Sequence, residues 1–198
     1  MKKLILICLT LCACGLNRTS TPSMFYTITV PNVQQVRGPQ KPVNVVLENV
    51  SVPQSVDRPQ IVIKQTDSNI VHVSEFDRWI ENLGPALGGA VVENMNKYAK
   101  NINARVVRNA SNVPNVNYIV SIDFVRFETE ANANITVSAW WTVSNARGEI
   151  LVQKKTTLTA ETPEYSGETP DYDAIVATQS DLVARLAYKI ADTISELK

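Results

Sequence analysis

The apolar positions of this chain change their spacing several times, and each spacing predicts one kind of element. In the first half, short β-rich runs are separated by Pro, Gly and Asn, which is typical of strands joined by turns. Apolar residues on both sides of one run, Val43–Val50, indicate a strand that is buried on both faces. The predicted strands are Phe25–Val30, Val43–Val50, Ile61–Lys64, Ile70–Val73 and Ala104–Val107. A turn at 67–69 predicts that the third and fourth of them form a hairpin.

A helical stripe begins after this hairpin. Ser74 and Asp77 have the spacing of a capping box, so we expect Ser74 to cap a helix. Pro85, preceded by Gly84, predicts a kink inside that helix. Gly88 lies within the same stripe and not between a strand and a helix, so it indicates close helix packing and no phosphate loop. Residues three or four apart form the stripe: Phe76, Trp79, Ile80, Leu83, Leu87, Val91, Met95 and Tyr98.

Three longer strands follow, Val116–Phe127, Ile135–Val143 and Ile150–Leu158, and short turns between them predict an antiparallel meander. Side chains alternate between the two faces of a strand. Trp141 therefore shares a face with apolar neighbours and is predicted to lie in the core. Trp140 shares the other face with Ser and Thr residues, so it is either exposed or covered by something else.

A final helix is expected to begin at Thr169, as its N-cap, with Pro170 in the first helical position. Its apolar stripe runs from Tyr172 to Leu197. Two helices that are apolar on one side need one sheet face to cover. The order of elements therefore predicts an α/β (α+β) fold: a two-layer sandwich of a mixed, mostly antiparallel sheet with two main helices on one face. The other sheet face, rich in Ser and Thr, would stay wet or meet a partner.

The first residues have a different pattern from the rest of the chain. Two lysines precede an apolar run, Leu4–Leu11, which is shorter than the roughly 20 residues that cross a bilayer and has the length of a signal-peptide core. The segment Leu11-Cys12-Ala13-Cys14 resembles the bacterial lipoprotein signal, although a leader that merely contains cysteines is the alternative. The resemblance implies a signal peptide over 1–13 and a lipidated N-terminus at Cys14. Gly15 favours the outer membrane over retention at the inner one.

Three parts of the chain follow from this division. Residues 1–13 are the signal peptide, residues 14–23 form a flexible tether rich in Ser and Thr, and residues 24–198 form a single domain. All three cysteines lie within the first 14 residues, so the mature domain is expected to have no disulfide and no thiolate metal site. Without its two leader lysines the chain carries 17 basic and 19 acidic residues. That balance argues against nucleic acid as a partner.

The residues offer little for catalysis. His72 is the sole histidine, so no second imidazole or thiol joins it in a metal site, and we expect it to be exposed or half-buried. No G-x-S-x-G elbow is present. Asp123, Glu128 and Glu130 follow one strand and its end, where they indicate a solvated face. We therefore expect no enzyme, no catalytic residues, no metal and no cofactor.

One stretch of the domain resembles a known family. Val50-x-x-Pro53-x-x-x-Asp57-Arg58-Pro59-Gln60-Ile61-Val62, a hairpin, and then Trp79-x-x-x-Leu83 are similar to the auxiliary lipoproteins of ABC-type transport systems. The closest type is the PqiC-like outer-membrane lipoproteins that are encoded beside MCE-domain proteins. The similarity extends from the lipoprotein signal to the final helix, and the segment that contains Arg58 and Gln60 is its most specific part.

The resemblance implies a role without catalysis. Such a lipoprotein would be anchored by lipid in the outer membrane of a Gram-negative bacterium, facing the periplasm. There it would dock a periplasmic MCE assembly that carries phospholipid-like molecules between membranes, and would support envelope integrity. Self-association into a homo-oligomeric ring is also implied. A structural or regulatory lipoprotein that contacts peptidoglycan or its synthases is the alternative.

Four residues are candidates for partner binding: Arg58, Gln60, Trp79 and Trp140. Arginine and tryptophan are enriched among the residues that dominate interface energies. For Gln60, as for Arg58, the alternative is that their segment simply fixes the start of a strand. Arg58 is able to pair with Asp57 or Asp77 and to fix the start of a strand, and Trp79 lies on the helical stripe, where core packing is expected.

Overall fold

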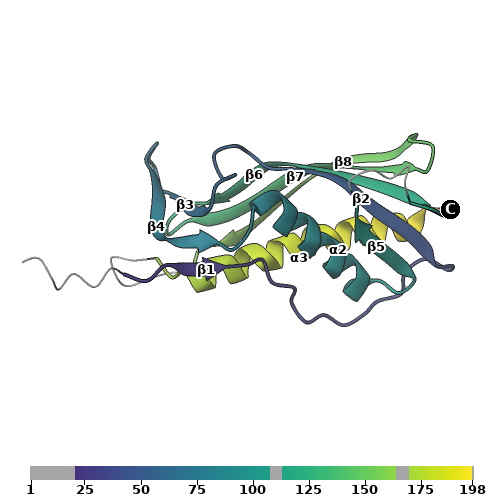
Figure 1. Cartoon of the computed structure of the whole chain (residues 1–198), viewed down its shortest axis with the longest axis horizontal. Coiled ribbons are helices and arrows are strands. Elements are labelled where there is room, and N and C mark those ends of the chain that lie inside the picture. The colour runs from purple at the N-terminus through teal and green to yellow at the C-terminus, as the bar shows by residue number, and fades with distance from the viewer. Residues whose placement is uncertain (1–20, 108–112, 164–169, 198) are drawn as a thin grey trace, which may run out of the picture.

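The computed structural model describes residues 21–107, 113–163 and 170–197 (Figure 1). The α+β class is confirmed, with eight strands and two helices among these residues. The predicted signal peptide and the first part of the tether lie outside the described residues. In chain order the elements are β1 (Met24–Tyr26), β2 (Val43–Ser51), β3 (Gln60–Lys64), β4 (Val71–Trp79), α2 (Leu83–Tyr98), β5 (Ile102–Val106), β6 (Tyr118–Thr129), β7 (Asn134–Asn145), β8 (Ile150–Glu161) and α3 (Tyr172–Glu196).

A five-stranded sheet in the order β5-β2-β6-β7-β8 forms most of the molecule. Its second half is the expected antiparallel meander of β6, β7 and β8. Its first half is parallel, because β2 pairs in parallel with both β5 and β6. Parallel neighbours need a long crossover between them, and α2 lies in the connection between β2 and β5. The mixed orientation is confirmed, with more parallel pairing than expected.

A second sheet of three strands, in the order β1-β4-β3, accompanies the first, where we expected one sheet. The β3–β4 hairpin is confirmed, and β4 also pairs in parallel with β1. The division arises at β6: β2 pairs with its first half, and β3 meets its end through a bridge between Lys64 and Glu130. The small sheet therefore continues past the large one and forms one end of the molecule (Figure 1).

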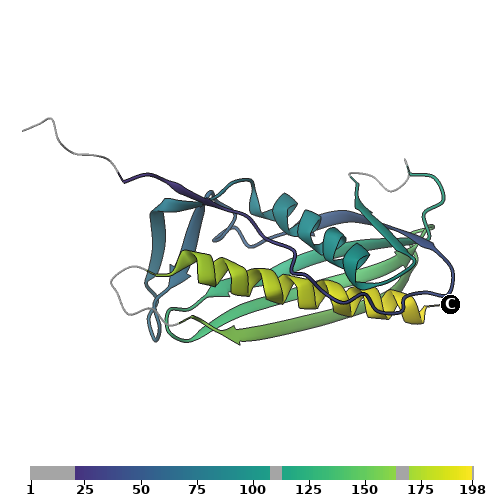
Figure 2. The same ribbon diagram turned by 90° about the horizontal axis from the view of Figure 1, so that it is seen from below.

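Both helices lie on the same face of the large sheet, as expected (Figure 2). They pack against each other, and the rings of Tyr98 and Tyr188 stack with centroids 4.2 Å apart. One continuous core joins the helices to the sheet. Its largest fully buried side chains include Trp141, Phe124, Leu47, Leu87, Leu182 and Leu186.

The predicted start of the first helix is wrong. Residues 71–79 are strand β4, and α2 begins at Leu83 with Asn82 as its N-cap. The hydrogen bonds of the expected box nevertheless form: the Ser74 hydroxyl accepts the amide of Asp77 at 2.9 Å and donates to its carboxylate at 2.8 Å. They close a bulge in β4, where the register with β3 shifts. Pairing with β1 and β3 has overridden the helical pattern.

The predicted kink at Pro85 is also wrong, and for the same reason. Because α2 starts at Leu83, Pro85 is its third residue, where a missing N–H costs no helical hydrogen bond. Gly88 does serve close packing, as expected. A Cβ there would lie 3.2 Å from a Val50 methyl group, so any larger residue would require Val50 to shift by a few tenths of an ångström.

The cap of the final helix differs from the prediction by two residues. The N-cap of α3 is Asp171, whose carboxylate accepts the amide of Ala174 at 3.0 Å. Pro170 precedes this cap, and Thr169, the expected cap, lies outside the described residues. Apart from this offset, α3 is the predicted helix, and its apolar stripe is buried over six turns.

Candidate functional site

The face of the large sheet opposite the helices, called the outer face below, is the surface that this fold leaves uncovered (Figures 1 and 2). Strand register places one transverse row of side chains across it. Ser51 of β2 lies opposite Asp123 of β6, which lies opposite Trp140 of β7, which lies opposite Lys155 of β8. Residues directly opposite each other share a face and are in contact range. The next row contains only Asn49, Ser121, Thr142 and Gln153.

Trp140 is the aromatic residue of this row. It is 44% exposed, and the ammonium of Lys155 lies 5.8 Å from its ring. At its other side, Asp123 accepts a hydrogen bond from Ser51. Its neighbour Trp141 is 2% exposed, and its indole N–H donates to Thr156 at 2.9 Å. The predicted alternation of the two tryptophans is confirmed, and Trp140 remains open to a partner.

Arg58 and Gln60 lie at the start of β3, near the small sheet. Arg58 is exposed, and it takes part in none of the ion pairs found among the described residues. Backbone hydrogen bonds fix this segment: the Trp79 amide donates to the Pro59 carbonyl at 2.7 Å. Gln60 is half-buried opposite Arg78. This geometry supports a structural role for the segment and leaves the Arg58 guanidinium available for a partner.

Trp79 lies inside the molecule. As the last residue of β4 it is 6% exposed, and its ring centroid lies 6.4 Å from that of Phe127. Core packing is therefore its role in this fold, although it reaches the core from a strand and not from a helix. Of the four candidates, Trp140 alone stands in the transverse row of the outer face. Ser51 and Lys155 were not predicted as site residues, because only the register between the strands brings them into the row of Trp140.

Tyr26 and Asp77 join β1 to β4. The Tyr26 hydroxyl donates to the Asp77 carboxylate at 3.1 Å, and Ser74 donates to the same carboxylate. The Arg58–Asp77 pair that we considered is replaced by these two hydroxyl contacts. Burial, reinforced by the hydrogen bond to Asp77, raises the pKa of Tyr26 from its ordinary value of 10.0 to about 12. The contact therefore depends on a protonated phenol.

This pKa predicts a pH dependence of stability. The unfolded chain loses the Tyr26 proton near pH 10 and the folded chain near pH 12, so the contribution is complete below pH 10 and is lost as the pH rises towards 12. We expect Tyr26→Phe to flatten the fall in unfolding free energy over this window, as measured by urea titrations at several pH values. Burial also raises the pKa values of Tyr98 and Tyr188, so the unfolding free energy of the variant should still fall with pH, but less steeply than that of the wild type. Equal slopes for both proteins would contradict the assignment.

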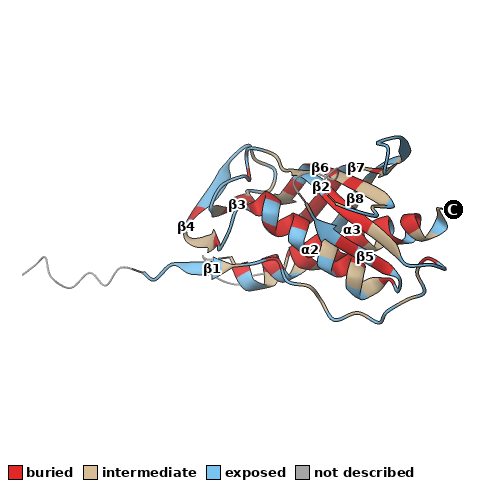
Figure 3. Cartoon of the chain, turned by 45° about the vertical axis from the view of Figure 1, so that its right-hand side comes forward, coloured by how far each residue is buried: buried red, intermediate tan, exposed pale blue. Residues whose placement is uncertain are grey.

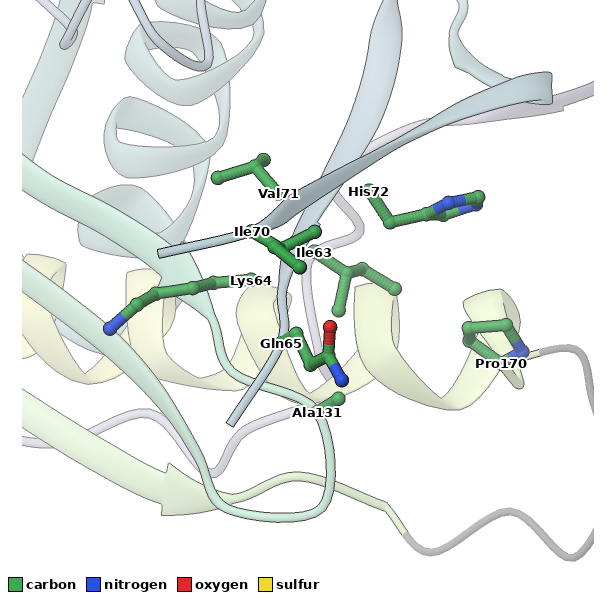
Figure 4. A pocket seen from close by; sticks show the side chains of 8 residues that line it. All are labelled: Ile63, Lys64, Gln65, Ile70, Val71, His72, Ala131 and Pro170. Carbon is green, nitrogen blue, oxygen red and sulfur yellow. The ribbon is translucent and has the colours of Figure 1, made fainter. Parts of the chain in front are cut away.

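A hollow of about 370 Å³ lies beside the β3–β4 hairpin (Figure 4). His72 is exposed, as expected, and extends to the opposite side of the hairpin from Lys64 (Figure 4).

Among the described residues, no group of three or more His, Cys, Asp or Glu side chains is placed to hold a metal ion. Within those residues, no helix is long and apolar enough to cross a membrane.

A comparison with protein families identifies the chain. The model of the ABC-type transport auxiliary lipoprotein component matches residues 26–191, which include every element from the end of β1 to most of α3. The chain belongs to this family. The auxiliary lipoprotein is therefore assigned to ABC-type transport, and its family is not a known class of enzymes. No protein with a curated description matches its sequence significantly.

Solved structures share the fold of the auxiliary lipoprotein. A Xanthomonas campestris protein of the family DUF330 superposes with a TM-score of 0.69 at 14% identity, over 87% of this chain and 95% of that one. An uncharacterised protein superposes with a TM-score of 0.67 at 15% identity, over 88% of this chain and 100% of the other. At such low identity these likenesses concern the fold alone.

Proposed function

We propose that this protein is a lipid-anchored, periplasm-facing accessory subunit of an MCE-containing ABC-type transport system. In this role it docks the periplasmic MCE assembly at the outer membrane and so supports envelope integrity. Membership of the transport auxiliary lipoprotein family is the observation that carries the proposal. The lipoprotein signal that ends at Cys14, and the similarity of the segment around Arg58 to PqiC-like proteins, support the finer assignment.

The outer face is the docking surface that we assign to the MCE partner. At its centre the exposed Trp140 lies between the carboxylate of Asp123 and the ammonium of Lys155, and hydroxyl and amide side chains surround them. Interfaces commonly place an aromatic anchor within such a polar surround. The role is binding without catalysis, and it needs no metal or cofactor. A ring of several copies remains part of the proposal, and the mass of the detergent-solubilised protein tests it.

The proposal predicts that Trp140→Ala weakens MCE binding. Truncation of a central tryptophan commonly costs about 2 kcal/mol or more, which corresponds to roughly 30-fold in affinity. The measurement is co-purification of the lipidated protein with the MCE-domain protein of the same bacterium in mild detergent. The unfolding curve of the variant should stay close to that of the wild type, because Trp140 lies outside the core.

Val106→Ala is the matched control for this experiment. Val106 is 52% exposed but lies on β5, away from the row that contains Trp140, so its truncation should leave co-purification unchanged. If both variants retain the MCE protein, the outer face is not the docking surface. If even the wild type fails to retain it, and instead binds peptidoglycan or a peptidoglycan synthase without the transporter, the alternative function is favoured.

A further inference from the structure

The small sheet has an exposed apolar side that the proposed docking role does not use. Among the described residues, six of the eleven exposed large apolar side chains lie on β1 or β4 or directly beside β4. Exposed stretches of these strands are visible at one end of the molecule in Figure 3. Monomeric proteins seldom gather so many exposed apolar residues in one place without a function. The six are Met24, Phe25, Ile70, Val71, Val73 and Ile80.

Register shows which of them share one face of the small sheet. Ile61 and Ile63 of β3 are buried, so the alternate residues of β3 face outward. Val73 and Val71 lie opposite two of those residues, Val62 and Lys64, and so face outward too. Phe25 lies opposite Arg78, which lies opposite outward-facing Gln60. Phe25, Val71 and Val73 thus form one apolar surface, called the end face below, with Ile70 and Ile80 at its margins.

The charges around the end face nearly balance. Lys64 is 3.5 Å from the carboxylate of Glu130. The Arg78 guanidinium donates to the backbone carbonyl of Glu75 at 3.3 Å and keeps its charge, but the acidic residues Glu75 and Asp77 belong to the same bulge of β4. No excess of positive charge is left to attract anionic lipid or an acidic protein. Whatever covers this surface is therefore recognised through its apolar character.

The chain itself indicates what covers the end face. Residues 14–23 connect Cys14 to β1, whose Met24 is one of the exposed apolar residues. Ten residues span at most about 33–36 Å when extended. As a flexible coil they average roughly 17 Å. An acyl chain on Cys14 would thus hold a bilayer next to β1, at the end of the molecule where the apolar residues gather.

The opposite end is too far away to be held in the same manner. The bridge between Lys64 and Glu130 places the β6–β7 turn beside the small sheet. From there β7 runs for 12 residues to the β7–β8 turn. At roughly 3.3 Å per residue, this distance is about 40 Å. The β7–β8 turn and the small sheet accordingly lie at opposite ends in Figure 1.

From these observations we propose that the end face rests on the surface of the phospholipid bilayer and inserts Phe25, Val71, Val73 and Ile80 into its interface. The lipid anchor and the end face then form a two-part attachment that fixes the orientation of the domain. Acyl chains at the end of a flexible tether hold the domain near the bilayer but leave it free to rotate. With the end face on the membrane, the β7–β8 turn points away from it, and the outer face stands accessible to a partner from the side.

The test uses the lipidated full chain and its cysteine content. Since all three cysteines lie in the first 14 residues, a Val71→Cys substitution adds the one free thiol of the mature protein. An environment-sensitive dye on this thiol reports contact with nitroxide-labelled lipid in phosphatidylcholine vesicles. Arg147→Cys, at the exposed β7–β8 turn, is the matched control. Labelling with palmitate in the same preparation verifies the anchor.

We expect the emission of the dye at residue 71 to fall by about half with nitroxide lipid, because interfacial segments lie roughly 5–10 Å inside the headgroup boundary. The dye at residue 147 should be unaffected. Phe25→Asp combined with Ile80→Asp should abolish quenching at residue 71, because charge on the end face prevents insertion, while palmitate labelling persists. Exchange of phosphatidylcholine for phosphatidylglycerol should change none of these values, because the end face carries nearly balanced charge.

Several outcomes would overturn the inference. The proposal is wrong if the dye at residue 71 is not quenched in a palmitate-labelled protein, or if residues 71 and 147 are quenched equally. It is also wrong if, in detergent without lipid, the emission of the dye at residue 71 indicates burial that increases with protein concentration. A second copy of the chain would then cover the end face. The inference rests on the proposed lipid anchor. An absence of palmitate refutes that anchor separately, whereas loss of MCE binding alone leaves the end face untouched.

Discussion

Trp141→Ala should lower the unfolding free energy by about 3–5 kcal/mol, as large truncations in a packed core do. Trp141 is 2% exposed and lies at the centre of β7, the middle strand of the meander. Its removal leaves a cavity between the sheet and the helices. It also removes the hydrogen bond that the indole N–H donates to the Thr156 hydroxyl. For a chain of this size the melting temperature should fall by roughly 6–20 °C.

The control for this prediction is the adjacent residue. Trp140→Ala removes the same side chain from the same strand, but on the outer face, where it is 44% exposed. We expect it to change the unfolding free energy by less than about 1 kcal/mol, as surface substitutions usually do. The measurement is thermal and urea unfolding of both variants beside the wild type. Equal losses would mean that Trp140 is covered, and would remove the reason to place a partner on the outer face.

The contrast between these two tryptophans could be predicted because it depends only on alternation along one strand. The meander and α3 were predictable on similar grounds, since each has a long and uninterrupted period. In each case the signal extends over ten or more residues of one element. Local disturbances at the ends, such as the cap at Asp171, then displace a boundary without changing the element.

The β4 segment could not be predicted from its local pattern. Ser74 and Asp77 form the hydrogen bonds of a capping box, yet the backbone around them belongs to a bulged strand. Such a motif closes equally well in a turn or bulge as at a helix start. Pairing of Tyr26 with Trp79 decides between the two, and these residues lie 53 positions apart. Sequence periodicity carries no information about a pairing of this range.

The transverse row across Trp140 escaped prediction for a related reason. Register between β2 and β6 shifts after Leu47, and register between β6 and β7 shifts after Phe124. The first shift sets the pairing of Ser51 with Asp123, and the second lies between the β6–β7 turn and the pair of Asp123 with Trp140. The neighbours of Trp140 therefore depend on irregularities that the alternation does not reveal. The sequence indicated a polar sheet face with one tryptophan. The structure adds that a carboxylate and an ammonium flank this tryptophan.

Cys14→Ala should remove the protein from the outer membrane. If Cys14 is the lipidated residue, the variant incorporates no labelled palmitate, and it keeps its signal peptide because the lipoprotein signal is cut only before a modified cysteine. The precursor should therefore migrate as the longer chain and stay with the inner membrane. Each buried CH₂ of an acyl chain contributes about 0.8 kcal/mol, so several chains on one residue give an attachment that no single substitution in the domain could replace.

Cys12→Ala provides the matched control, because Cys12 lies two residues before Cys14 and should leave with the signal peptide. This variant should be labelled, shortened and sorted to the outer membrane like the wild type. Separation of the two membranes on a density gradient, with palmitate labelling of each fraction, distinguishes the variants. Loss of label from Cys12→Ala but not from Cys14→Ala would move the anchor, lengthen the tether before β1 by two residues and leave the end face within reach of the bilayer. Label in neither the variants nor the wild type would leave the domain unanchored, and the bilayer would then no longer account for the exposed apolar residues of the small sheet.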